Sequence, residues 1–275
     1  MADARIPRCD LHTHSSFCVG DDTPEAFVTE TLARRMQVLG FSAKAPVSFD
    51  LAHSMRREDL PAYRREILRL RGAYGDRIEL LLGIEQDFYA VETGETWDYI
   101  IGSVHYLCLE GEYVAIDRSK EALQSLVRER FGGDFYRLAE QYFALVSELP
   151  ARTECNIVGH FDLLAKFNGD GSLFDETHPR YLRPAMDALD ALLSQGAVLE
   201  INTSDMCAGL RRVPYPAPLF LHRIAEKRGR VLLSSNAHRK EDLLAGFAQG
   251  VRIARAAGIG GLSVWTREGW KTQPI

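Results

Sequence analysis

Histidine side chains recur in this chain just after short apolar segments, where they could together bind a divalent metal ion. His12 and His14 form a His-x-His pair, and His105, His160 and His238 follow three later segments. Neutral imidazoles together with a carboxylate are common ligands of zinc, iron and manganese. A His-x-His pair alone is weak evidence, because such pairs often arise by chance. Five histidines at four segment ends favour a metal site.

Two residues with side-chain oxygens, Glu85 and Asn236, also follow apolar segments and could bind the same ions as the histidines. Alternating residues of an extended strand point to the same side, so His12 and His14 can bind one ion together. Glu85 follows another apolar segment and offers a carboxylate that can bridge ions, and Asn236 lies two residues before His238. These residue types predict a centre built from imidazoles around a shared glutamate.

Short apolar segments alternate with longer amphipathic ones, as in repeated strand and helix units around a parallel sheet. Strands are predicted at 9–12, 40–43, 78–84, 99–104, 156–159, 198–201 and 231–234, with an eighth candidate at 262–265. Helices are predicted at 24–39, 60–74, 134–149, 179–194, 217–227 and 240–257. No linker or repeat divides the chain, so we expect an α/β fold with one closed, TIM-like barrel domain over residues 1–275. In such a barrel the carboxyl ends of all strands open onto one face, which would bring the candidate ligands together.

The composition is that of a soluble globular protein, with 46% apolar and 26% charged residues. A net charge of −5 and the lack of a basic stretch argue against a nucleic-acid partner. No secretory signal or long apolar run is present, so we expect a cytoplasmic protein without a membrane partner. Five cysteines without a CxxC pair predict neither disulfides nor a thiolate zinc site. Cys9 and Cys155 lie in predicted strands and should be buried.

Six segments resemble the histidinol-phosphatase branch of the polymerase and histidinol phosphatase (PHP) family. They occur in the family's order and cover nearly the whole chain. They are DLHTH at 10–14, GIEQD at 83–87, DYIIGSVHYL at 98–107, VGHFDL at 158–163, LEINT at 199–203 and SNAHR at 235–239. The resemblance implies a distorted seven-stranded (β/α) barrel, with up to three metal ions at the carboxyl ends of the strands.

The resemblance also implies a ligand set. Glu85 would be shared by two ions. The other ligands of the first ion would be His12, His14 and Asn236, where Asn236 replaces an aspartate of the family pattern. The other ligands of the second ion would be His105 and His160. A third ion would use His238.

The third site departs from the family pattern. The segment FSAKAP at 41–46 places Ala43 and Lys44 where the family has Asp-His, and residues 17–22 offer only Asp21 or Asp22 in place of an expected histidine. One interpretation is that Lys44 replaces the third ion and faces the substrate phosphate, leaving two divalent ions, zinc, iron or manganese. The other is that the site has decayed or serves another substrate. We favour the first.

The resemblance implies hydrolysis of a small phosphomonoester, with L-histidinol phosphate as the expected substrate. Ions bridged by Glu85 would lower the pKa of a bound water toward neutrality. Lys44 and an arginine would meet the charge on the phosphoryl oxygens. The arginine candidates are Arg211, Arg212 and Arg239. The alternatives are a hydrolase of another phosphoester and a non-catalytic binding or regulatory descendant, and either a monomer or a homo-oligomer fits the composition.

Two aspartates and three histidines remain outside this ligand set. Asp87 and Asp162 follow ligand motifs closely, so each would either orient an imidazole or cap a helix. His53, His178 and His222 are expected in surface or local structural roles.

Overall fold

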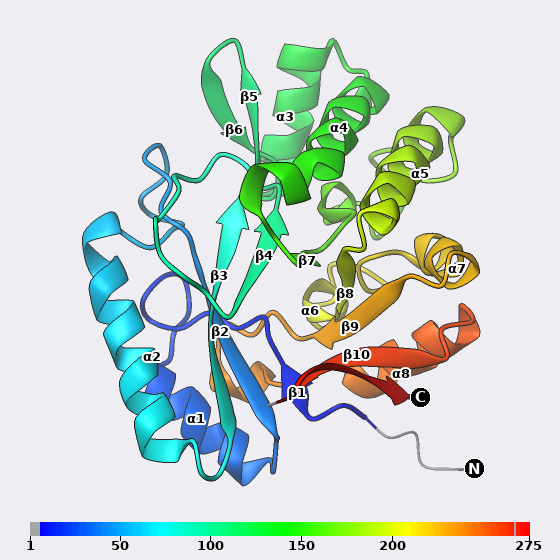
Figure 1. The fold of residues 1–275 in the computed structure, drawn as a ribbon. Helices are drawn as coiled ribbons and strands as arrows, with labels where there is room; N and C mark the ends of the chain where they lie inside the picture. Colours follow the sequence, from blue (N-terminus) through cyan, green and yellow to red (C-terminus); the bar gives the residue numbers. More distant parts are fainter. Residues whose placement is uncertain (1–5, 267) are drawn as a thin grey trace.

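Seven parallel strands form a nearly closed barrel in the computed structural model, which describes residues 6–266 and 268–275 (Figure 1). Neighbouring strands follow the order β1-β2-β3-β4-β7-β8-β9. Their bounds are Cys9–Asp10 (β1), Val38–Lys44 (β2), Glu79–Asp87 (β3), Tyr99–Ser103 (β4), Ile157–Val158 (β7), Val198–Asn202 (β8) and Arg230–Ser234 (β9). All seven predicted barrel strands are therefore confirmed, with small shifts in their ends.

Two segments that follow the first and last strands close the barrel. Thr13 and Ala237 form a parallel bridge. The backbone N–H of His14 donates to Ala237 O at 2.8 Å, and the N–H of Ala237 donates to His12 O at 3.1 Å. Because this bridge joins the two ends of the barrel, it brings the His-x-His pair beside the last histidine motif.

Helices surround the barrel, with α1 and α2 on one side and α7 and α8 on another (Figure 1). The helices are Pro24–Ala33 (α1), Leu60–Tyr74 (α2), Lys120–Phe131 (α3), Phe135–Thr153 (α4), Pro179–Ser194 (α5), Ser204–Cys207 (α6), Pro218–Glu226 (α7) and Phe247–Ala256 (α8). Helix α2 shows how the sequence produces this packing. Its residues Tyr63, Ile67 and Leu70 recur at helical spacing and are buried, while the remaining face is largely charged. None of the described helices has the length and hydrophobicity that crossing a membrane requires.

Several predicted elements need correction. The helix predicted at 24–39 ends at Ala33, because Arg35 has a positive φ of 54° and β2 begins at Val38. The helix predicted at 240–257 begins only at Phe247, after Leu244 and Gly246 adopt positive φ. The pairing of two antiparallel hairpins was not predicted, and neither were the strands β5, β6 and β11 or the helices α3 and α6. The hairpins are Tyr106–Leu109 with Glu112–Ala115 (β5 and β6), and Gly261–Thr266 with Gly269–Pro274 (β10 and β11).

The eighth strand candidate, 262–265, lies in the β10 and β11 hairpin and forms no part of the barrel sheet. Val264 and Trp265 of this hairpin pack against the first residues of several barrel strands, including Cys9 and Val38. The hairpin therefore covers the amino end of the barrel and leaves the carboxyl end open. All five cysteines are free, and Cys9 and Cys155 are buried as predicted.

An aromatic ring fills the barrel interior below the carboxyl end. Tyr99 is 1% exposed, and its hydroxyl donates to Leu11 O at 2.5 Å. A Cβ at Gly40 or Gly83 would overlap the Tyr99 side chain, so both strands carry glycine where the ring crosses them. This apolar layer forms the floor beneath the polar side chains of the strand ends.

Candidate metal centre

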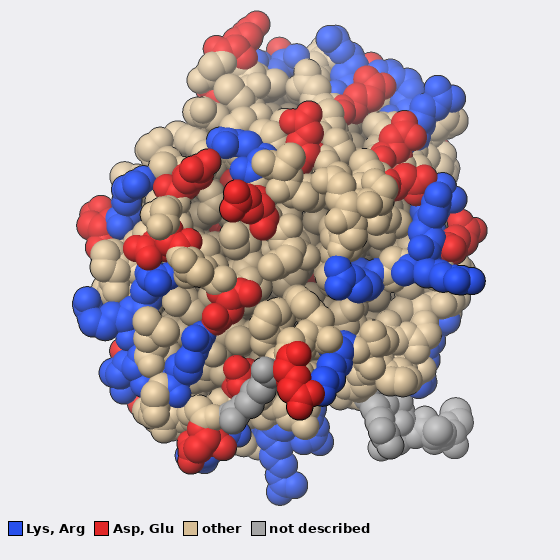
Figure 2. Space-filling view, in the orientation of Figure 1, with Lys and Arg blue, Asp and Glu red and all other residues tan. Residues whose placement is uncertain are grey.

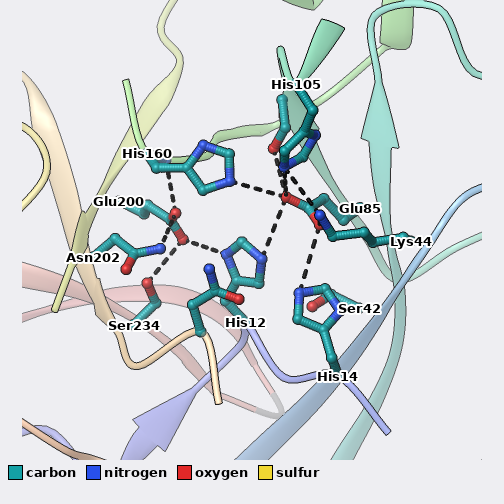
Figure 3. A network of polar contacts seen from close by, with 12 residues as sticks. His12, His14, Ser42, Lys44, Glu85, His105, His160, Glu200, Asn202 and Ser234 are labelled. Carbon is teal, nitrogen blue, oxygen red and sulfur yellow. Dashed lines mark hydrogen bonds and ion pairs between the residues drawn. The ribbon is translucent and has the colours of Figure 1, made fainter. Parts of the chain in front are cut away.

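The predicted ligands converge at the carboxyl end of the barrel (Figure 3). His12, His14 and Glu85 are almost completely buried, and His105 and His160 are buried beside them. The ring centroids of His14 and His238 lie 4.6 Å apart, which places the last predicted histidine in the same cluster. Five histidines from four separate parts of the chain thus meet in one centre.

Glu85 lies at the middle of the cluster. Its Oε1 is 3.1 Å from His160 Nε2, 3.4 Å from His105 Nε2 and 3.5 Å from His12 Nε2. Its Oε2 is 3.5 Å from His14 Nε2. The two oxygens therefore face different imidazoles, which is the arrangement that a carboxylate shared between two ions requires.

Several buried polar atoms of the cluster have no hydrogen-bond partner among the described residues. They are Nε2 of His12, Nε2 of His14, Oε2 of Glu85 and Oδ1 of Asn236. Leaving such atoms unpaired is costly, and most buried polar groups in proteins are paired. One ligand atom each from His12, Glu85 and His160 lies within 4.8 Å of the others. The residues present fit a divalent metal ion.

The carboxylate of Glu200, to which the sequence analysis assigned no role, forms hydrogen bonds with two of the predicted ligands. Glu200 on β8 accepts a hydrogen bond from His12 Nδ1 at 2.7 Å and another from the backbone N–H of His160 at 2.7 Å. Asn202 Nδ2 and Ser234 Oγ also donate to this carboxylate, at 2.7 and 2.8 Å. Bonding at Nδ1 orients the ring so that His12 Nε2 faces Glu85.

Two other imidazoles are oriented in the same way. Asp87 Oδ2 is 3.2 Å from His105 Nδ1 and also accepts the backbone N–H of His105 at 2.8 Å. His238 Nδ1 lies 2.9 Å from Asn236 O, to which it donates. The first contact directs His105 Nε2 toward Glu85, so Asp87 occupies the orienting position that its sequence context indicated.

The charges of the cluster are strongly coupled. Burial lowers the pKa of His12, but the carboxylates of Glu200 and Glu85 outweigh burial and raise this pKa to about 10. Burial raises the pKa of Glu200, but His12 outweighs it and brings this pKa to about 2. For His14, burial and His238 lower the pKa well below its ordinary value. Burial and Lys44 lower the pKa of His238 to about 4. At neutral pH, His14 and His238 therefore present lone pairs.

Lys44 enters the cluster from the end of β2. It is the register partner of Glu85 on the neighbouring strand β3. Its Nζ lies 3.2 Å from His105 Nε2 and 3.9 Å from Glu85 Oε2, and its side chain is 20% exposed. The ammonium group thus contacts the centre from the cavity side, while remaining accessible.

The structure separates the arginine candidates. Arg239 lines the cavity beside the centre, and its Nη2 is 3.1 Å from Asp242 Oδ1. Arg212 is exposed and is not among the residues that line this cavity. Arg211 is buried, with Nη2 3.1 Å from Asp162 Oδ2 and its guanidinium 4.3 Å from the Tyr215 ring centroid. The guanidinium of Arg211 is therefore already paired with Asp162 and Tyr215, and it is not a free group for a phosphate.

The residues near the altered third site also have partners. Asp22 accepts from Lys240 Nζ at 3.0 Å and so faces away from the cluster. Cys18 is closer, because its Sγ lies 3.5 Å from His14 Nδ1. His53 contacts Asp50 at 2.8 Å, and the side chain of His178 caps α5, so both have local structural contacts as expected.

A cavity of about 380 Å³ opens beside the centre. It is lined on the metal side by Lys44, His105, His160, Asn236 and His238. Its other walls come from the loops after β6, β7, β8 and β9, and include Asp117, Lys166, Asp205, Tyr215 and Asp242. This volume suits a small metabolite, and charges of both signs line it.

The molecular surface gives no sign of a polyanion-binding face in the view of Figure 2. Basic and acidic side chains are interspersed across this view, without a continuous basic stripe.

Comparison with known proteins connects this geometry to one family. Residues 10–204 match the model of the PHP domain. A Deinococcus radiodurans protein named "Probable histidinol-phosphatase" is 32% identical over 284 residues, which cover 97% of this chain and 98% of the relative. A histidinol-phosphatase of Lactococcus lactis is 26% identical over 210 residues, or 72% of each chain.

A solved structure has the same fold. The histidinol phosphate phosphatase of Lactococcus lactis, complexed with zinc, L-histidinol and phosphate, superimposes with a TM-score of 0.72. The match covers 96% of this chain and 98% of that chain at 19% sequence identity. At this identity the likeness supports the barrel fold.

Proposed function

This chain belongs to the PHP domain family, and from that premise we propose that it is a metal-dependent phosphomonoesterase that hydrolyses L-histidinol phosphate to L-histidinol and phosphate. The observation that carries the proposal is the buried ring of imidazole nitrogens around Glu85, with its unpaired Nε2 and Oε2 atoms. The names of the relatives, which are histidinol phosphatases, support the substrate.

We assign the ligands to two sets that share Glu85, as the resemblance to the family implies. One set would comprise His12, His14, Glu85 and Asn236, and the other Glu85, His105 and His160. Zinc, iron and manganese all accept such nitrogen and oxygen donors. When bound, these ions supply Lewis-acid stabilisation of the phosphoryl oxygens and a nucleophilic water at neutral pH.

The chain's own residues prepare this centre. Glu200, Asp87 and the carbonyl of Asn236 fix the ring orientations of His12, His105 and His238. The apolar floor around Tyr99 lies below the ligands, and the cavity gives access to them from the other side. These contacts fix the ring orientations before an ion binds, and His105 becomes available as a ligand once Lys44 leaves its Nε2.

Lys44 adds a positive charge where the phosphoryl group would lie. Its Nζ must leave His105 Nε2 before that nitrogen can serve as a ligand, and the released ammonium would remain beside the cavity. An ammonium at this point can donate to phosphoryl oxygens and stabilise their charge. Arg239, on the cavity wall, would also bind the phosphate if its guanidinium left Asp242.

The test combines metal content with turnover. Protein purified without chelator should contain about two transition-metal ions per chain by elemental analysis, and should release phosphate from L-histidinol phosphate. Glu85→Gln removes the shared charge and should abolish both properties, whereas Glu58→Gln, at an exposed glutamate, should change neither. A protein that binds metal but leaves L-histidinol phosphate intact would refute the substrate. A protein that holds no metal would refute the hydrolase proposal.

A further inference from the structure

One carboxylate of the substrate cavity lacks a partner. Among the described residues, three aspartates line this cavity. Asp205 Oδ2 accepts the hydroxyl of Tyr215 at 2.6 Å, and Asp242 Oδ1 is 3.1 Å from Arg239 Nη2. The Oδ1 of Asp117 is buried without a hydrogen-bond partner, and no described residue lies within ion-pair distance of its carboxylate. Burial raises the pKa of Asp117, but the more distant charges of His105, Lys44, Lys166 and Arg118 outweigh burial and lower it.

The backbone on either side of Asp117 is firmly held. The N–H of Ile116 donates to His105 O at 3.0 Å, which places the next residue beside a predicted metal ligand. Arg118 Nη2 donates to the Tyr106 hydroxyl at 3.0 Å and also contacts Asp50. The backbone on both sides of Asp117 is thus held at the junction of the metal centre and the cavity.

A carboxylate oxygen that is buried without a hydrogen-bond partner is costly, because cations beyond contact distance replace only part of its lost hydration. Such unpaired groups are uncommon in proteins except at sites where a bound ligand supplies the missing hydrogen bond. Asp117 belongs to neither of the two ligand sets proposed above, and it lines the cavity that a substrate would enter. Its missing partner is therefore better explained by a cationic group of the substrate.

The cavity has charges for both ends of a zwitterion. Lys44 and Lys166 line it, and no described residue forms an ion pair with Lys166. These cations suit a phosphate, whereas Asp117 suits an ammonium group. We propose that Asp117 accepts a hydrogen bond from the substrate's ammonium group and thereby selects amino-bearing phosphomonoesters. This inference rests on the proposed function, since it names the recognition element for that substrate.

The test removes the amino group from the substrate and the charge from Asp117. The wild-type enzyme should prefer L-histidinol phosphate over 3-(imidazol-4-yl)propyl phosphate, its deamino analogue, by at least about tenfold in kcat/KM, which is the scale of one charge-assisted hydrogen bond. Asp117→Asn should remove most of this preference. Asp205→Asn, at a cavity aspartate that already has a partner, should keep it.

Binding of the alcohol products gives the same comparison without turnover. Calorimetry should show L-histidinol binding more tightly than 3-(imidazol-4-yl)propanol to the metal-loaded wild type, and equally weakly to Asp117→Asn. Equal binding of the two alcohols by the wild type would overturn the inference, as would a lower metal content in Asp117→Asn. Absence of phosphate release from either ester would instead refute the proposed function, while the binding comparison would still decide the role of Asp117.

Discussion

Glu200 Oε2 and His12 Nδ1 lie 2.7 Å apart across the barrel, joining β8 to the segment after β1. Both side chains are fully buried. The same carboxylate accepts the backbone N–H of His160, so one group orients two predicted ligands that are far apart in the sequence. The positions of His12 and His160 in the metal centre thus depend on where the barrel places Glu200.

Replacing Glu200 with glutamine should weaken metal binding by about 10- to 100-fold, because carboxylates that orient metal-binding imidazoles have effects of this size. Competition with a chromogenic chelator measures the change. Glu58→Gln provides the control at an exposed site. If Glu200→Gln bound metal as tightly as wild type while remaining folded, His12 would not depend on this contact.

Metal binding should release a proton from His12 at neutral pH. Without a bound ion, the two flanking carboxylates raise the pKa of His12 to about 10, so this imidazole is protonated at pH 7. A metal ligand must be neutral at the coordinating nitrogen, so binding expels the proton. Titration calorimetry in two buffers of different ionisation enthalpy counts the released protons. Glu200→Gln removes one of the two carboxylates and should lower this number, whereas an unchanged count would show that His12 is not the source.

Lys44→Ala should weaken the binding of inorganic phosphate to the metal-loaded protein by about tenfold or more, the scale of one hydrogen bond between charged groups. The ammonium is the nearest lysine charge to Glu85 that also lines the cavity. Lys227→Ala, at an exposed lysine paired with Asp190, is the matched control. An unchanged phosphate affinity in Lys44→Ala would exclude this role.

The double substitution Lys44→His with Asn236→Asp should raise the number of bound ions per chain. It restores an imidazole and a carboxylate at positions where His238 and His14 already lie close together. Asn236 has a φ of 47°, which aspartate also tolerates, so the backbone need not change. Elemental analysis would show the increase, and an unchanged stoichiometry would contradict the assignment of these positions.

Much of the barrel was predictable because its signals are local. Each buried strand is a short apolar segment, and each ligand follows one directly, so periodicity together with the rule of shared carboxyl ends predicted that His12, Glu85, His105 and His160 would meet. The role of Glu200 was not predictable in this way. It lies within an apolar strand, and only the closure of the barrel brings it to His12. The one sequence feature that could have indicated this role is that Glu200 places a carboxylate inside an apolar strand.

The remaining errors also have tertiary causes. The β5 and β6 hairpin and α3 are short or highly charged segments whose packing against the barrel, rather than their periodicity, stabilises them. The contact between Lys44 and His105 depends on strand register, which residue types do not reveal. The helix predicted to begin at 240 was interrupted by positive φ at Leu244, a residue that seldom adopts this conformation.

The floor of the centre can be tested through its glycines. A Cβ added at Gly83 would overlap the Tyr99 ring, which is buried and cannot swing away without losing its bond to Leu11 O. Gly83→Ala should therefore lower the free energy of unfolding by about 1–3 kcal/mol, the usual cost of overpacking. Gly72→Ala is the matched control, because nothing lies within 4 Å of its Cβ in helix α2. It should raise stability by about 0.5–1 kcal/mol through helix propensity. Urea denaturation measures both changes, and equal effects at the two glycines would show that Tyr99 does not pack across the barrel as described.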